Sequence, residues 1–129
     1  MTEHTYSEDA VAGYGYPPSL VWTGPSRDAT GSMPLGNGDI AMNLWVEESG
    51  DVVFYIAKSD AWDENGSLLK LARIRLTLAP NPIARGAPFR QTLRLDEGAI
   101  LIEAGGVEGI TLRAWVDANR PAVRLEIIS

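Results

Sequence analysis

The sequence contains no cysteine and only one histidine, His4, among its 129 residues. The absence of cysteine excludes disulfides and thiolate metal sites, and it leaves the redox compartment open because cysteine-free domains occur everywhere. His4 lies in a polar N-terminal stretch, outside the region expected to fold. This argues against a Ser-His-Asp triad and against a histidine-ligated metal centre. We therefore expect no metal and no other cofactor.

Concentrated positive charge and long apolar runs are also missing. The formal net charge is -6, and the arginines fall singly on expected strands, whereas nucleic-acid binding requires a basic patch or stripe. No stretch approaches the roughly 18 apolar residues of a membrane span. The start, MTEHTYSEDAVAGYGYPPS, lacks the cationic and apolar regions of a secretory signal. We expect no nucleic-acid or membrane partner. The localisation stays open: the protein is cytoplasmic, or secreted if the sequence is a fragment.

Short β-rich runs, separated by turn residues at intervals of ten to fifteen residues, predict an antiparallel β domain. Alternation is clear where Ile74 and Leu76 are interleaved with Arg73 and Arg75, which predicts one dry and one wet face. The candidate strands are 20–23, 39–48, 51–59, 72–79, 89–96, 99–104, 109–118 and 122–128. A short helix remains an alternative only for DENGSLLKLAR, residues 63–73.

The hydrophobic content of 45% and the chain length support one domain. We expect residues 1–18 to form a flexible lead-in and residues 19–129 to form an all-β, antiparallel β-sandwich. The last run, RPAVRLEIIS, is still strand-like where it stops. We therefore expect the chain to continue into a missing C-terminal domain, or this edge to dock onto another surface.

The PLGNG loop, SMPLGNGD at residues 32–39, is constrained at nearly every position. Pro34 fixes its own φ, and Gly36 and Gly38 permit positive φ on either side of Asn37. Such a loop can hold the Asn37 side chain in one direction, with Asp39 at the mouth of the next strand. The alternative is a simple turn in which asparagine tolerates the left-handed conformation. A phosphate loop is excluded because the Lys-Ser/Thr ending is absent.

The tryptophan loop, KSDAWDENG at residues 58–66, gathers Asp60 and further acidic and amide side chains around Trp62. An aromatic face beside carboxylates is typical of sugar recognition. Calcium binding is an alternative, although the spacing differs from the helix-flanked twelve-residue loop. In a purely structural alternative, Trp62 packs over the end of the sandwich and the acids are solvated.

Asp39 and Asp60 lie at the same end of the hairpin predicted around the turn EESGD. Two carboxylates about 5 to 10 Å apart can hydrolyse a glycosidic bond. Nothing in the sequence indicates that either side chain is buried, so neither is assigned as catalytic.

Trp22, the segment MPLGNGDIAMNLWVE and a strand ending in SDAW together resemble the opening of glycoside hydrolase family 95. The sequence resembles still more closely an uncharacterised family, numbered 5703 among domains of unknown function, that forms the N-terminal part of large glycosidase-like bacterial proteins. The resemblance covers roughly residues 20–96. The two loops at this spacing are more specific than either loop alone.

The resemblance implies a β-supersandwich, related to galactose mutarotase, that stands before an (α/α)6-barrel catalytic domain. In family 95 the catalytic carboxylate and its assisting asparagines lie in that barrel, so no catalytic residue is carried over to this chain. The two loops are expected to face the barrel, which places Asn37, Asp39, Asp60 and Trp62 at an interface or substrate edge. Asp39 replaces the basic residue usual in family 95, and the Asn-Glu-Asp-Thr run is absent. Fucoside specificity is therefore not implied.

Three functions remain open at this point. The first is a non-catalytic N-terminal domain of a glycoside hydrolase-like protein, which packs on the barrel and contacts oligosaccharide; it predicts an exposed apolar patch beside the loops. The second is an independent carbohydrate-binding module with a platform of Trp62 and Trp45 or Trp115. The third is a structural or assembly domain, in which Trp62 is buried and Asn37 bonds only to its own turn.

Overall fold

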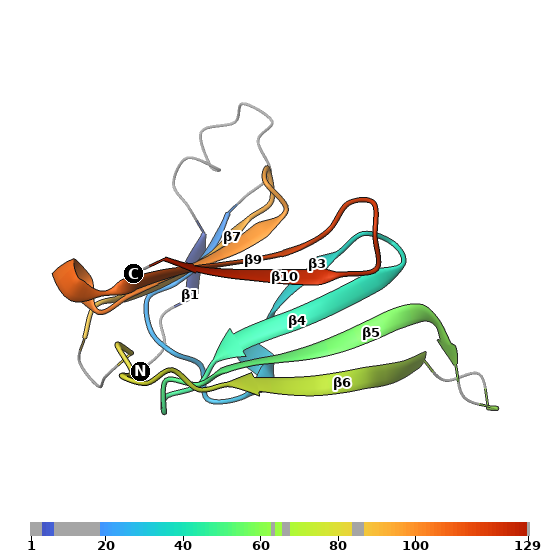
Figure 1. The fold of residues 1–129 in the computed structure, drawn as a ribbon, viewed down its shortest axis with the longest axis horizontal. Helices are drawn as coiled ribbons and strands as arrows, with labels where there is room; N and C mark the ends of the chain where they lie inside the picture. The colour runs from blue at the N-terminus through green and yellow to red at the C-terminus, as the bar shows by residue number, and fades with distance from the viewer. Residues whose placement is uncertain (1–3, 7–18, 63, 66–67, 84–86, 129) are drawn as a thin grey trace.

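The computed structural model describes residues 4–6, 19–62, 64–65, 68–83 and 87–128 (Figure 1). For residues 4–6, 60–62, 68–70 and 108 it describes the backbone alone. The strands are β1 (His4–Tyr6), β2 (Leu20–Trp22), β3 (Met33–Gly36), β4 (Ile40–Val46), β5 (Val52–Trp62), β6 (Leu68–Leu76), β7 (Phe89–Arg94), β8 (Ala99–Ala104), β9 (Ile110–Val116) and β10 (Val123–Ile128). Two 3-10 turns, η1 (Ala29–Gly31) and η2 (Gly106–Glu108), complete the described elements. None of the described helices is long and apolar enough to cross a membrane.

The strands form two antiparallel sheets. The larger has the order β1-β2-β7-β8-β9-β10 and the smaller the order β3-β4-β5-β6. β3 contacts β8 and β9 in the larger sheet, and β4 contacts β9, so the two sheets stack face to face. The predicted all-β class with antiparallel strands is confirmed, and the arrangement is that of a sandwich.

The core lies between the facing sheets and follows the period-two alternation of the strands. On β4, Met42, Leu44 and Val46 point inward and are almost completely buried, while Asn43 on the opposite face is exposed. On the neighbouring strands, the residues paired with inward-facing positions also point inward and add to the same core. The fully buried members include Met33, Met42, Leu44, Val46, Val52, Ile100, Ile102 and Leu112.

Trp45 points to the outer face of the smaller sheet, opposite Val53 on β5. Its ring lies 5.4 Å from that of Tyr55, and the Arg73 guanidinium lies 6.0 Å from the Trp45 ring centroid. Only 2% of Trp45 is exposed. It therefore cannot contribute to a solvent-facing aromatic platform.

Three strands differ clearly from the sequence-based expectation. β6 begins at Leu68, so the stretch considered for a short helix enters a strand instead, with Leu71 at a bulge opposite β5. β3 occupies the first half of the PLGNG loop; Pro34 is tolerated there because β3 is the edge of its sheet. β1 falls within the expected lead-in and pairs with β2. The rest of residues 1–18 lies outside the described part of the chain.

The two sheets separate from one another on the side of β10. Because β3 contacts β8 and β9 while β4 contacts β9, successive strands of the smaller sheet step toward β10. Figure 1 shows β4, β5 and β6 diverging from β9 and β10. Burial falls in the same direction: on inward positions, Ile74 of β6 is 37% exposed, and Leu125 and Ile127 of β10 are 36% and 44% exposed.

We name this region the open side. It consists of the inward-facing apolar residues Ile56, Ile74, Leu76, Val123, Leu125 and Ile127. These residues face the interior of the sandwich but stay partly exposed to solvent.

Candidate functional site

The two loops singled out in the sequence meet at one end of the β4–β5 hairpin. The register pairs Ile40 with Lys58, and the backbone N–H of Ser59 donates to the carbonyl of Asp39 at 2.8 Å. Asp60 is the next residue of β5, so its backbone lies at the same end of the hairpin as Asp39. The predicted pairing of the two loops is therefore confirmed for the backbone.

Asn37 connects the PLGNG loop to the larger sheet. Its Oδ1 accepts hydrogen bonds from the backbone N–H groups of Asp39 and Ile40, at 2.9 and 2.8 Å. Its Nδ2 donates to the carbonyl oxygens of Asp117 and Arg120, at 2.8 and 3.1 Å. The amide thus uses both donors and both acceptor positions. Asn37 closes its own turn and also ties it to the β9–β10 connection.

Asp39 forms an ion pair with Lys58, with Nζ 3.3 Å from Oδ1. The two side chains are 48% and 31% exposed, so the pair is accessible to solvent at the end of the hairpin. Exposed ion pairs of this kind contribute little to stability. The Asp39 carboxylate can therefore leave Lys58 and bind another polar group at little cost in free energy.

The side chains of Asp60 and Trp62 lie outside the described residues, as does all of Asp63. Glu64 and Asn65 are exposed in the turn that follows β5. The structure therefore brings Asn37 and Asp39 together and places the backbone of Asp60 beside them, while the predicted stacking role of Trp62 stays a prediction.

A depression of about 590 Å³ lies beside Asn37 at this end of the sandwich. Its walls include Gly36 of β3, Glu97 of the β7–β8 turn and Trp115 of β9. The Arg113 guanidinium stacks over the Trp115 ring at 4.5 Å from its centroid, and Glu97 pairs with Arg94 at 3.2 Å. Sequence reasoning considered Trp115 only as a companion of Trp62. It missed Glu97 altogether, because no local pattern shows which distant strand ends meet.

Asp117 anchors the β9–β10 connection at the edge of this depression. Its Oδ1 accepts from the backbone N–H of Asn119 at 2.9 Å, and its Oδ2 accepts from Nε of Arg124 at 3.1 Å. The bond from Asn119, followed by that from Arg124, holds the pKa of Asp117 below its ordinary value. The carboxylate therefore stays charged and holds the segment whose carbonyls receive Asn37.

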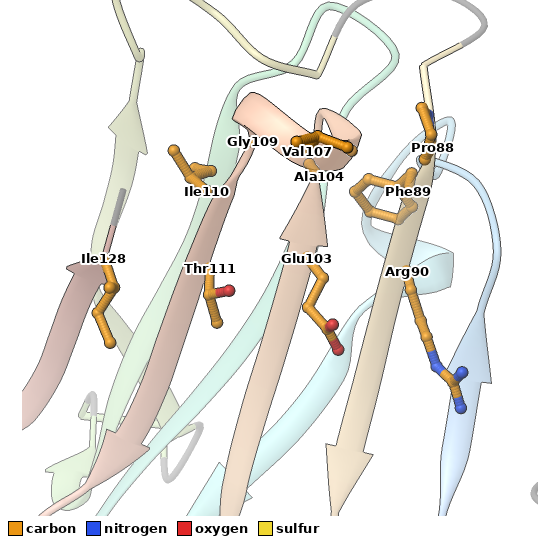
Figure 2. Close-up of a pocket in the computed structure, with 11 residues that line it drawn as sticks. Pro88, Phe89, Arg90, Glu103, Ala104, Val107, Gly109, Ile110, Thr111 and Ile128 are labelled. Carbon is orange, nitrogen blue, oxygen red and sulfur yellow. The ribbon is translucent and has the colours of Figure 1, made fainter.

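A second depression, of about 500 Å³, lies on the outer face of the larger sheet at the other end of β9 (Figure 2). Arg90, Glu103, Thr111 and Ile128 form a row across four adjacent strands. Phe89, Val107 and Ile110 line the end nearest η2. No residue predicted for a site lies in this second depression.

Within the described part of the chain, no group of three or more acidic or histidine side chains is placed to hold a metal ion. The pKa values of Asp28, Asp51 and Asp117 are lowered, in each case first by a hydrogen bond to the charged carboxylate. A general acid requires the opposite shift. The lowered pKa values of these three carboxylates therefore fit a structural role, in which the charged carboxylate accepts hydrogen bonds.

The comparisons with known proteins agree with the closer of the two resemblances seen in the sequence. A family model described as "Domain of unknown function (DUF5703)" matches residues 21–129. No curated protein and no solved structure gave a significant match. The matched range includes the β4–β5 hairpin, Asn37 and both depressions. The chain therefore belongs to the DUF5703 family of domains of unknown function.

Proposed function

We propose that this chain is the non-catalytic N-terminal β-sandwich domain of a glycoside hydrolase-like protein, and that it packs through its open side on a helical-barrel catalytic domain of the same protein. The likeness of the PLGNG and tryptophan loops to those of family 95 supports this proposal. The galactose-mutarotase-like supersandwich is part of the same proposal. The reaction would be carried out by the barrel, because this chain contributes no catalytic residue.

The open side is the observation that carries the proposal. Leu125 and Ile127 of β10 pair with Ala114 and Leu112 of β9, and all four side chains point to the inner face of the sheet. The two β9 residues are fully buried, whereas the two β10 residues are partly exposed. Full burial of an aliphatic side chain contributes about 1.5 to 3 kcal/mol. A surface that covered the open side would therefore stabilise the protein by burying its partly exposed residues. Apolar surface that is left uncovered and bordered by polar residues commonly marks an interaction site.

The loop end adjoins the open side through β5, on which Lys58 follows Ile56 at the next inward position. A domain packed on the open side would therefore lie close to Asp39 and Asp60. In this arrangement Asp39, Asp60 and Trp62 border the substrate entrance, where carboxylates bind hydroxyl groups and an aromatic ring stacks on a sugar. Asn37 holds the loop in place.

Amide hydrogen exchange tests this proposal. The exchange of β6 and β10 is measured in the isolated chain and in the full-length product of the gene. We expect β6 and β10 to exchange more slowly in the longer protein, while the core strand β8 serves as an internal control. Unchanged exchange in both strands would overturn the proposal, as would a stop codon directly after Ser129.

A carbohydrate-binding module is the second candidate, and the depression beside Asn37 favours it. Trp115, Glu97 and Asp117 provide an aromatic ring and carboxylates around a concave surface. A glycan screen would compare the parent chain with Trp115→Ala and Trp62→Ala. Binding that Trp115→Ala abolishes without loss of fold would support a module at this depression. Loss with Trp62→Ala alone would place the module at the tryptophan loop.

A further inference from the structure

The free edge of β10 lacks the features that keep other strand edges from pairing. β10 ends the larger sheet, and among the described strands only β9 pairs with it. Its register runs without a bulge from Val123 to Ile128, and the strand contains neither proline nor lysine. Each of the other edge strands described has such a feature: β1 has only three residues, β3 contains Pro34 and β6 is paired through a bulge. β10 is therefore the edge most open to pairing with another strand.

The backbone groups at this edge belong to Val123, Leu125 and Ile127. In an antiparallel ladder, residues whose N–H and C=O groups point to the neighbouring strand alternate with residues whose groups point away from it. The carbonyl of Ala122 accepts from the backbone N–H of Asp117 at 2.9 Å, so Ala122 directs its carbonyl toward the β9 side. The alternation then directs the N–H and C=O groups of Val123, Leu125 and Ile127 to the free edge.

A second copy of β10 matches these groups when the two strands run antiparallel about a two-fold axis at Leu125. Leu125 then lies opposite Leu125 of the second copy, and Val123 lies opposite its Ile127. At each of these positions both strands direct N–H and C=O groups toward each other, as hydrogen-bonded pairs require. The same side chains face inward, where Leu125 and Ile127 are 36% and 44% exposed. Pairing would bury part of this apolar surface.

The same register brings opposite charges together on the outer face of the sheet. Arg124 of each copy lies opposite Glu126 of the other, in the closer, non-hydrogen-bonded type of pair. Both side chains are exposed, and Arg124 binds Asp117 through Nε at 3.1 Å, which leaves its two Nη groups for a second carboxylate. Glu126 is paired on its other side with Arg113 of β9. The row of Arg113, Glu126 and the second copy's Arg124 therefore alternates in charge, which stabilises strand pairing.

Other registers of two β10 strands fit less well. An axis at Arg124 or at Glu126 would place each of these residues opposite itself, and like charges at paired positions are destabilising. It would also turn the free backbone groups of the two strands out of register. An axis at Val123 or at Ile127 keeps the backbone register but shortens the paired strand. The backbone groups and the charges thus select the same axis, at Leu125.

We propose that two copies of this chain associate through their β10 strands, paired antiparallel about a two-fold axis at Leu125. The larger sheets of the two copies then form one continuous sheet. Association uses the edge of β10, whereas the docking domain proposed above covers the inward face of the open side. The inference therefore goes beyond the proposed function and does not depend on it.

Two charge-reversal variants test the pairing by sedimentation equilibrium over a range of concentrations. We expect a monomer–dimer equilibrium for the parent chain. Glu126→Arg places arginine opposite arginine at both symmetric positions, and Arg124→Glu places glutamate opposite glutamate. Each variant alone should raise the Kd of the dimer about tenfold or more. An equimolar mixture of the two variants should restore association, because one chain then carries two arginines and the other two glutamates at the paired positions.

Glu48→Arg is the matched control, since it makes the same charge change in the exposed β4–β5 turn and should leave the Kd unchanged. Far-ultraviolet circular dichroism checks that each variant is folded. A parent chain that stays monomeric up to about 1 mM, where even weak specific association is populated, would overturn the inference. So would a dimer with the same Kd for the parent and Glu126→Arg, or a mixture that associates no better than its components.

Amide hydrogen exchange of the parent chain provides a measurement that needs no variant. Dilution should accelerate exchange at Val123, Leu125 and Ile127, because these amides point to the second copy. Exchange at Arg124 and Glu126, whose amides point to β9, and in β6 should stay the same. Rates of the three edge amides that do not depend on concentration would overturn the inference. β6 separates the two proposals, because docking protects β6 in the longer protein whether or not two copies pair.

Discussion

At the scale of single residues, Asn37 connects the loop end to the larger sheet. Its amide forms four hydrogen bonds, two within its turn and two to the carbonyls of Asp117 and Arg120. Asn37→Ala leaves these partners without the amide. Two of these bonds are part-buried and two are exposed. Because each lost part-buried bond costs about 1 kcal/mol net and each exposed bond less, we expect the free energy of unfolding to fall by about 2 to 3 kcal/mol. Urea denaturation measures the change.

Asn43→Ala is the matched control for Asn37→Ala. Asn43 lies on the exposed outer face of β4, only a few residues away. Its replacement should alter the free energy of unfolding by no more than about 0.5 kcal/mol. Equal losses for the two variants would contradict the role assigned to Asn37.

The carboxyl of Asp117 gives a prediction for pH. Its pKa is below the ordinary value of 3.8, because the Asn119 N–H and then the Arg124 guanidinium stabilise the charged form. A lowered pKa contributes stability that is present above the unfolded-state value and is lost as the pH falls through the folded-state value. We expect Asp117→Asn to be less stable than the parent at pH 6. The gap should close toward pH 3.

Denaturation midpoints measured from pH 6 to pH 3 test this expectation. The other carboxyls titrate in both proteins. Their contribution therefore cancels when the stability of Asp117→Asn is subtracted from that of the parent. A difference that stayed constant over the whole range would show that Asp117 is not stabilised in its charged form.

At the scale of elements, two turn glycines form a matched pair. Gly50 joins β4 to β5 with a φ of 91°, and Gly98 joins β7 to β8 with a φ of 61°. A Cβ at Gly50 would overlap the side-chain amide of Asn81, whereas a Cβ at Gly98 would meet nothing within 4 Å. We expect Gly98→Ala to cost about 1 to 2 kcal/mol for the left-handed conformation, and Gly50→Ala to cost about 1 to 3 kcal/mol more for the overlap.

A double-mutant cycle isolates the overlap in the Gly50 turn. Asn81 donates to the carbonyl of Ser49 at 3.2 Å and accepts from the N–H of Ile83 at 2.9 Å. Asn81→Ala should therefore destabilise the parent chain. In the Gly50→Ala background it should cost less, because it also removes the clash. Thermal unfolding of the four proteins provides the measurement, and strict additivity would argue against the overlap.

The sequence was most informative for elements with a regular pattern. β4, β8 and β9 were predicted from the β-rich runs 39–48, 99–104 and 109–118, and the turns that contain Gly50 and Gly98 follow from residues that tolerate positive φ. β3 was missed because proline and glycine in the PLGNG loop indicate a turn, although an edge strand also tolerates them. β6 was ambiguous at its start, since closely spaced leucines fit a helix as well as a strand.

The candidate site was predictable only as far as one hairpin determines it. Asn37 and Asp39 lie two residues apart in one loop, and the register of β4 and β5 brings the backbone of Asp60 to the same end. The bonds from Asn37 to Asp117 and Arg120 join the two sheets across 80 and 83 residues. No local pattern encodes such a contact, because it depends on how the finished sheets stack.

At the scale of the whole molecule, the two sheets are offset rather than fully superposed. β9 is covered by the smaller sheet, and its Leu112 is fully buried. β10 lies one strand further out, and its Ile127, paired with Leu112, is 44% exposed. The difference between paired neighbours comes from the offset of the sheets, since both side chains are apolar and point to the same face.

The offset predicts that charges are tolerated on the open side of the isolated chain. In the double variant Ile74→Lys and Leu125→Lys, the aliphatic stems can stay on the apolar walls while the ammonium groups reach water. We expect the free energy of unfolding to change by about 1 kcal/mol or less. Leu112→Ala, in the covered part of the same sandwich, should cost about 2 to 5 kcal/mol.

Binding of a hydrophobic dye such as ANS provides a second measurement on the same proteins. Because the open side is partly exposed apolar surface, the double lysine variant should bind less dye than the parent while keeping its far-ultraviolet circular dichroism. If the double variant instead lost several kcal/mol, Ile74 and Leu125 would belong to a closed core. The offset of the sheets would then leave no surface for a docking domain.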